Sequence, residues 1–312
     1  MADQCAAHDR TDPPPAAGPK PGRMAQYRLG LALVTASAVA WSTAGYFTRL
    51  IPLDAFTLLA WRGLFGGIGV AIVSAALARP LGFRFALGGA GWLFALVSAA
   101  TMILFIASLT LTTVAHVAII YATVPFVAAG LAWLALGERP SARALLASAA
   151  AFAGVAVTAG LSAEGGWLGD LLACAQTLGM AGMMVIARRF PSIPALPAAG
   201  LSALLSAAAS WPLGHPLAVS PRDLALLALF GLCQSALGIG LFSLGARYLP
   251  AVETALIGAL DAPLAPLWVF LAFGETPGPA TLGGGAIVFI AVGSYLALAA
   301  GAPSPAAKPD AV

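Results

Sequence analysis

"LALGERPSARALL" (residues 134–146) and "LAFGETPGPATLG" (residues 271–283) decide how this chain is organised, because they align without a gap at an offset of 137 residues. Both contain the pattern Gly-Glu-x-Pro, formed by Gly137, Glu138 and Pro140 in the first copy and by Gly274, Glu275 and Pro277 in the second. Each copy follows one long apolar stretch and precedes another. The sequence therefore predicts two related halves.

The composition identifies the environment of these halves. Of the 312 residues, 60% are hydrophobic and only 9% are charged, and the mean hydropathy is +0.93. Soluble domains carry about 25% charged residues. This composition excludes a water-soluble globular domain and predicts a polytopic membrane protein.

Apolar runs of about 20 residues, the length that crosses some 30 Å of hydrocarbon as a helix, occur ten times and predict an all-α fold. They cover residues 30–48, 54–78, 88–108, 114–136, 144–161, 167–187, 196–213, 224–244, 251–273 and 280–300. The predicted domains are a disordered tail over 1–28, five-helix repeats over 29–161 and 162–300, and a second disordered tail over 301–312. Residues 1–28 lack the apolar core of a cleavable signal peptide, so we expect the first helix to be retained.

The distribution of positive charge supports this helix count, because cytoplasmic loops are enriched in Lys and Arg. With a cytoplasmic N-terminus, twelve basic residues fall inside: Arg10, Lys20, Arg23, Arg28, Arg79, Arg84, Arg139, Arg143, Arg188, Arg189, Arg247 and Lys308. Arg49 and Arg222 fall outside, and Arg62 lies within a helix. We therefore expect a multi-pass protein of the cytoplasmic (inner) membrane with both termini cytoplasmic. The pI near 9.0 reflects this topology and gives no reason to expect a nucleic-acid partner.

Five helices per half have a consequence for orientation. Because five is odd, the second half enters the membrane upside down relative to the first, which makes the chain an inverted repeat. Two such halves are able to expose a site near the bilayer midplane first to one side and then to the other. The symmetry thus favours a carrier that works by alternating access.

The pattern also resembles a known family. Ten helices in two halves, with a proline-containing helix that ends in Gly-Glu-x-Pro, are similar to the EamA-type members of the drug/metabolite transporter superfamily, over about residues 30–300. "WSTAGYFTRLIPLDAFTLLAWRG" (residues 41–63) resembles the start of such proteins, with small polar residues in the first helix and an Arg in the second. The resemblance implies a transporter and leaves its cargo open.

Asp261 is the first candidate site residue, in the apolar stretch "ALIGALDAPLAPLWVFLAFGE" (residues 255–275). It lies about 15 Å into the ninth helix, where a charge costs on the order of 3 kcal/mol. Pro263 and Pro266 each remove a backbone donor, and Pro125 does the same in the fourth helix, so helix breaks are predicted at these prolines. The functional interpretation is a broken helix that lines a substrate or proton site. The alternative is a carboxylate that pairs with another helix to hold the bundle together.

Arg62 is the second deep charge, about 12 Å into the second helix. Its guanidinium stays ionised when buried, so it either pairs with Asp261 or binds an anionic substrate. An Arg at this point recurs in the family that the chain resembles, among relatives with different cargoes. That recurrence favours an architectural role for Arg62.

Other polar residues at depth predict a cavity with aromatic faces and a few hydrogen-bonding groups. They are Trp41, Ser42, Thr43, Tyr46, Thr101, Tyr121, Thr123, Gln176, Gln234 and Ser235. The alternative is that they hydrogen-bond between helices, as Ser and Thr often do. His116, near the outer surface, and Glu253, near the cytoplasmic surface, are further candidates for proton transfer or for simple solvation.

The sequence lacks the residues that several other classes of function require. An intramembrane enzyme requires a nucleophile with a base or clustered ligands, but the histidines are only His8, His116 and His215 and no GxSxG occurs. The lysines, Lys20 and Lys308, lie outside any phosphate-binding loop. The three cysteines form no CxxC pair, so no metal or other cofactor is expected.

The sequence therefore predicts a secondary active transporter for a small organic metabolite, such as an amino acid or a related compound. We expect export, with proton coupling as a further expectation. An intramembrane enzyme and a non-transporting structural or signalling subunit are the alternatives. Small-residue faces at Gly63 and Gly67 and at residues 283–285 are compatible with a monomer or a weak homodimer in the lipid bilayer.

Overall fold

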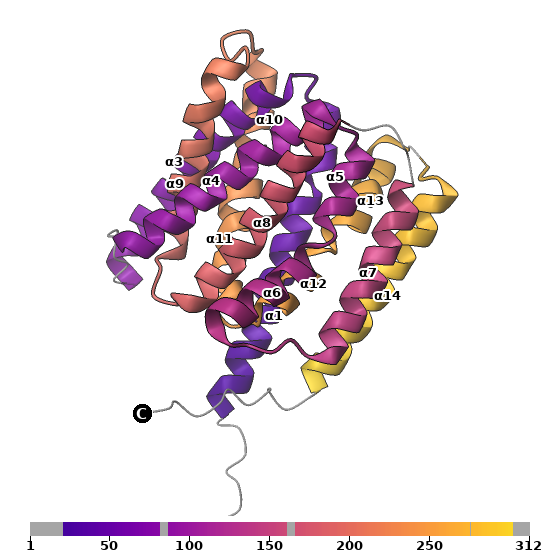
Figure 1. Ribbon diagram of the computed structural model, residues 1–312. Coiled ribbons are helices and arrows are strands. Elements are labelled where there is room, and N and C mark those ends of the chain that lie inside the picture. Colours follow the sequence, from indigo (N-terminus) through magenta and orange to yellow (C-terminus); the bar gives the residue numbers. More distant parts are fainter. Residues whose placement is uncertain (1–20, 82–86, 161–165, 275, 302–312) are drawn as a thin grey trace, which may run out of the picture.

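The fold is a bundle of helices (Figure 1). The computed structural model describes residues 21–81, 87–160, 166–274 and 276–301, and no strand occurs among them. Ten helical segments of the described chain are long and apolar enough to cross a membrane. The predicted all-α fold with ten spans is therefore confirmed. These segments are numbered below as spans 1 to 10 in chain order.

Several spans are divided into shorter helices. The first half contains α1 (Pro21–Ser42), α2 (Ala44–Leu50), α3 (Ala55–Leu81), α4 (Gly88–Leu111), α5 (Val114–Tyr121), α6 (Val124–Leu136) and α7 (Ala142–Ala159). The second contains α8 (Trp167–Arg189), α9 (Ala195–Ser210), the 3₁₀-helix η1 (Trp211–Leu213), α10 (Pro221–Gly231), the π-helix η2 (Leu232–Ile239), α11 (Gly240–Ala246), α12 (Ala251–Gly258), α13 (Asp261–Phe273) and α14 (Pro279–Gly301). Spans 1, 4, 7, 8 and 9 each comprise two or three of these elements.

The N-terminal boundary differs from the prediction. Helix α1 begins at Pro21, so residues 21–28 are helical and do not belong to a tail. Proline is favoured at the first helical position, where its missing N–H has no intrahelical partner and its φ angle already suits a helix. The rest of the predicted tails, residues 1–20 and 302–312, lies outside the described residues, as does Glu275 of the second Gly-Glu-x-Pro copy.

The repeat is visible in the positions at which helices begin and end. Helices α5 and α12 start 137 residues apart, and so do α6 and α13, which both contain 13 residues. Each of the latter two ends at a glycine in the left-handed region, Gly137 with φ 67° and Gly274 with φ 69°. The offset in the sequence therefore corresponds to a repeated three-dimensional unit, a broken helix closed by a left-handed glycine.

The packing of the two halves follows the same symmetry. Helix α3 of span 2 packs on α9 of span 7, α6 of span 4 on α12 of span 9, and α7 of span 5 on α14 of span 10. Figure 1 shows α7 and α14 side by side, and the start of α1 and the end of α14 at one end of the bundle. Each of these pairs joins equivalent spans, as an inverted repeat requires.

Small residues permit these close approaches. A Cβ atom added at Gly154 of α7 would lie 2.7 Å from the carbonyl oxygen of Gly284 in α14, and one at Gly63 of α3 would lie 2.6 Å from that of Ala203 in α9. Both distances are shorter than real Cβ contacts. The small-residue faces predicted on spans 2 and 10 are thus occupied within one chain.

Candidate functional site

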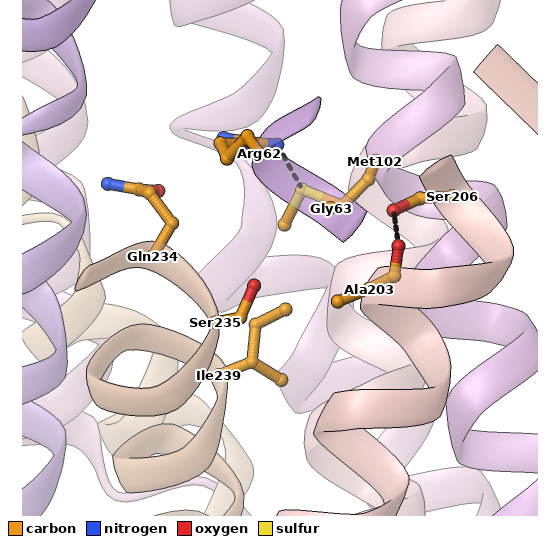
Figure 2. Close-up of a pocket in the computed structure, with 8 residues that line it drawn as sticks. All are labelled: Arg62, Gly63, Met102, Ala203, Ser206, Gln234, Ser235 and Ile239. Atoms are coloured by element: carbon orange, nitrogen blue, oxygen red, sulfur yellow. Dashed lines mark hydrogen bonds between the residues drawn. The ribbon is translucent and has the colours of Figure 1, made fainter. Parts of the chain in front are cut away.

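A small pocket lies between the two halves (Figure 2). It is lined by Arg62 and Gly63 of α3, Met102 of α4, Ala203 and Ser206 of α9, and Gln234, Ser235 and Ile239 of η2. Spans 2 and 3 of the first half therefore face spans 7 and 8 of the second. The space of about 10 Å³ holds about one water molecule, so the pocket is closed to a metabolite in this conformation.

Arg62 makes its contacts in this pocket with neutral groups. Its Nη2 lies 3.8 Å from the sulfur of Met102, and its Cζ lies 5.2 Å from the ring centroid of Phe230. The latter is a cation–π distance. Phe230 is buried and stacks on Phe47 at 4.8 Å, which fixes the ring. The guanidinium is held in place without a carboxylate.

The pairing of Arg62 with Asp261 that the sequence allowed does not occur in this conformation. Among the described residues, the ion pairs that involve an Asp or Glu join other residues, and neither Arg62 nor Asp261 takes part in one. The two deep charges therefore belong to separate places in the bundle.

The π-helix supplies the other polar side of the pocket. The Nε2 of Gln234 donates to the carbonyl oxygens of Ala40 at 3.1 Å and Trp41 at 3.3 Å, and the Nε1 of Trp41 donates to the carbonyl oxygen of Gln234 at 3.3 Å. Ser37 donates to the carbonyl oxygen of Gly238 at 2.9 Å. These bonds join η2 to the end of α1. π-Helical turns in α-helices are frequent at functional sites.

Span 1 is interrupted next to these bonds, which the sequence did not predict. Helix α1 ends at Ser42 and α2 begins at Ala44, and the hydroxyl of Thr43 donates to the carbonyl oxygen of Ala40 at 2.6 Å. Ser42 accepts a hydrogen bond of 2.8 Å from Nε1 of Trp268 in α13. Trp41, Ser42 and Thr43 therefore connect the pocket with span 9 instead of lining the pocket.

The predicted break in span 9 is present. Helix α12 ends at Gly258 and α13 begins at Asp261, whose side chain is half-buried. Pro263 occupies the first turn of α13, where a missing N–H is tolerated, whereas Pro266 lies inside α13 and does not end it. The predicted break at Pro266 is therefore wrong, because an isolated proline within a spanning helix costs only its local bonds.

Span 4 has the equivalent break. Helix α5 ends at Tyr121, and α6 begins at Val124 with Pro125 in its first turn. Thr123 donates to the carbonyl oxygen of Ile120 at 2.6 Å within this break. Helix α6, which follows this break, packs on α12, which precedes the break of span 9, and Ala122 and Ala259 of the two breaks pack against the same core cluster. The structure thus brings the two breaks together.

His116 and Glu253 lie in separate clusters away from the pocket. The Nδ1 of His116 is 3.1 Å from both carboxylate oxygens of Asp170, which also accepts a bond of 2.7 Å from Thr112. Glu253 is buried and accepts a bond of 2.8 Å from the hydroxyl of Tyr27. Neither residue is simply solvated.

The first Gly-Glu-x-Pro motif joins loops at one end of the bundle. Glu138 accepts a bond of 3.0 Å from Nε of Arg188, and Nη1 of Arg188 donates to the carbonyl oxygen of Arg247 at 3.1 Å. Arg247 in turn donates to the carbonyl oxygen of Ile193 at 3.1 Å. These bonds connect the ends of spans 4, 6 and 8, as the predicted topology requires.

Three predicted site residues lie elsewhere. The ring of Tyr46 meets that of Phe47 edge-to-face and lies tilted against that of Phe273. Thr101 donates to the carbonyl oxygen of Val97 at 2.7 Å in its own helix, and the buried Oε1 of Gln176 makes no hydrogen bond in the described chain. Several residues with clear contacts were not predicted, among them Tyr27, Asp170, Phe230 and Trp268. Asp170 could have been predicted from the sequence, because it is an acidic residue in the first turn of a spanning helix.

No group of His, Cys, Asp or Glu side chains in the described residues is arranged to hold a metal ion. Cys174 and Cys233 are free thiols.

Two inverted halves, each with a broken helix, and a pocket between them define an inverted-repeat membrane protein. The chain belongs to the EamA-like transporter family, whose model matches residues 28–160 and again residues 167–297. The two matches coincide with the two halves and confirm the resemblance read from the sequence. Members of this family are transporters, so the family gives no support to the enzyme alternative.

A solved structure described only as "Crystal structure of protein" has the same fold. The TM-score is 0.71, with 20% sequence identity, over 89% of this chain and 99% of that one. This likeness concerns the fold alone. Among curated proteins, none matches the sequence.

Proposed function

We propose that the chain is a secondary active transporter that moves a small organic metabolite, such as an amino acid or a related compound, out of the cytoplasm by alternating access. The observation that carries this proposal is the pocket between the two inverted halves, because residues of both halves line it. Rotation of one half against the other would open it toward one side and then the other. In this proposal, the closed pocket is an occluded intermediate of the cycle.

Proton coupling is the second part of the proposal. Asp261 lies at the break of span 9 and makes no ion pair within the described chain. An ionisable side chain at this depth is usually part of a substrate or proton pathway. We assign the proton to Asp261 and the pocket to the metabolite.

The test is flux in proteoliposomes. Vesicles loaded with a defined mixture of organic acids, amino acids, amines, nucleosides and sugars are incubated with and without a pH gradient, and the contents are quantified by mass spectrometry. We expect depletion of one chemical class, faster with a gradient. Equal retention by protein-containing and protein-free vesicles would contradict the transporter.

The orientation in the inner membrane is proposed from the basic residues and from the contacts among loops. Arg188 and Arg247, which are joined by a hydrogen bond, lie at the end of the bundle that we assign to the cytoplasm. A cysteine placed at Ser220 should react with an impermeant external reagent in intact cells, and one at Ser192 should not. The opposite labelling pattern would reverse the orientation.

The protein is proposed to act as a monomer. The close contacts of Gly63 with α9 and of Gly284 with α7 use the small-residue faces that a homodimer would need.

A further inference from the structure

The surroundings of Arg62 indicate what kind of group the pocket binds. Arginines inside membranes usually pair with acidic residues or face water, because an uncompensated charge is costly there. Arg62 instead contacts the thioether of Met102 and the ring of Phe230, which are both neutral. Among the residues that line the pocket, no acidic side chain is present to balance it. We therefore expect a ligand to supply the negative charge that balances Arg62.

A second group in the pocket lacks a partner. The hydroxyl of Ser235 points into the same space as Arg62 and makes no hydrogen bond within the described chain (Figure 2). The adjacent Gln234 has its amide nitrogen occupied by Ala40 and Trp41, which holds this turn of η2 in position. A cation and a hydroxyl donor thus converge on one space. Both are donors suited to an acceptor that carries negative charge.

The charge of the site limits the anion. No second basic side chain lines the pocket, so the described residues balance a single negative charge. A planar carboxylate accepts two parallel bonds from one guanidinium, whereas a phosphate dianion calls for more than one cation. The apolar side chains of Met102 and Ile239 complete the lining.

We propose that the Arg62 pocket binds the carboxylate of a small monocarboxylate with an apolar body, with Arg62 as the counter-charge and Ser235 as an additional donor. This assignment rests on the proposed transport function, since it names the class of metabolite that the pocket would carry. It also replaces the architectural role that the sequence favoured for Arg62.

The experiment compares acids with their uncharged amides on the purified full-length protein. Acetate, 4-methylpentanoate and phenylacetate are each titrated beside the corresponding primary amide at neutral pH, and binding is followed by thermal stabilisation and calorimetry. At least one acid should bind about tenfold or more tightly than its amide. Arg62→Gln should abolish the preference, and Ser235→Ala should reduce it.

The control is Arg222→Gln, which removes an exposed arginine at the start of α10 and should leave the preference unchanged. Arg62→Lys keeps the charge without the planar fork and should give an intermediate preference; this variant and the wild-type comparison test the proposal even if Arg62→Gln does not fold. Equal binding of acids and amides by the wild-type protein, or an acid preference that survives Arg62→Gln, would overturn it.

Flux measurements distinguish a failure of the proposed carboxylate site from a failure of the proposed transport function. Depletion of only neutral or cationic metabolites, equal in wild type and Arg62→Gln, would overturn the carboxylate site while the transporter stands. Acid binding that depends on Arg62, together with no flux of any metabolite, would overturn the transporter and leave the carboxylate site standing.

Discussion

The breaks in spans 4 and 9 have the same backbone and different chemistry. In span 4 the helix resumes at Val124, whose side chain is 3% exposed and packs in the core cluster that includes Phe94. In span 9 it resumes 137 residues later at Asp261, which is half-buried. A well-packed apolar residue in one copy thus corresponds to a carboxylate in the other.

This difference separates architecture from function. Because both copies break at the same place and end at a left-handed glycine, the break belongs to the repeated fold and needs no charge to form. The carboxylate occurs in one copy only and lies where a charge is costly. It is therefore expected to serve something that the fold alone does not require.

The largest expected effect concerns Asp261. Asp261→Asn keeps the size and part of the hydrogen bonding but no longer titrates, so flux in proteoliposomes should fall by roughly tenfold or more, the equivalent of about 1.4 kcal/mol. The remaining flux should lose its dependence on pH.

The matched control is the equivalent position of the other copy. Val124→Ala alters a residue that does not titrate, so its pH profile should follow that of the wild type, with flux reduced no more than any loss of folded protein explains. A pH profile that flattens equally in both variants would show that the two breaks do not differ in function.

A smaller effect, on the melting temperature, is expected at the left-handed glycines that end α6 and α13. No atom lies within 4 Å of a Cβ added at Gly137 or Gly274, so alanine there meets only the backbone penalty of the left-handed conformation, about 1 kcal/mol each. The two variants should melt a few degrees below the wild type and by similar amounts.

Gly130→Ala and Gly293→Ala are suitable controls, because these helical glycines also have open space and no positive φ. Alanine should leave the melting temperature unchanged or raise it there. If Gly137→Ala and Gly274→Ala differ widely, the two copies are not energetically equivalent.

Much of the fold could be predicted from the sequence, because membrane spans are set by length and hydropathy and the repeat by an offset of 137 residues. The break before Asp261 could be predicted as well, since proline cannot donate a backbone bond. The interruption at Thr43 and the π-helix over residues 232–239 could not, because neither contains a proline. Both depend on bonds between distant segments, such as those of Gln234 with Ala40 and Trp41.

The candidate site could be predicted only in part. Depth and polarity in the sequence predict Arg62, Gln234 and Ser235 as site residues, and the structure brings these three into one pocket. The same criterion also selected Tyr46, Thr101 and Gln176, which lie elsewhere. Depth along a helix can be read from a sequence, but the direction in which a side chain points depends on packing between helices. That packing also determined that Arg62 faces Phe230 and not Asp261.

A thermal melt of Asp261→Asn beside the double variant Arg62→Gln/Asp261→Asn is the most direct test of whether Asp261 is free for a role in transport or holds the bundle together by pairing with Arg62. Since the two charges do not pair in this structure, we predict that Asp261→Asn melts within a few degrees of the wild type and that the second substitution restores nothing. A carboxylate that held the bundle together through Arg62 would leave a buried, uncompensated charge when removed, at a cost of roughly 3 to 5 kcal/mol. A large fall in melting temperature for Asp261→Asn, reversed by Arg62→Gln, would contradict the account.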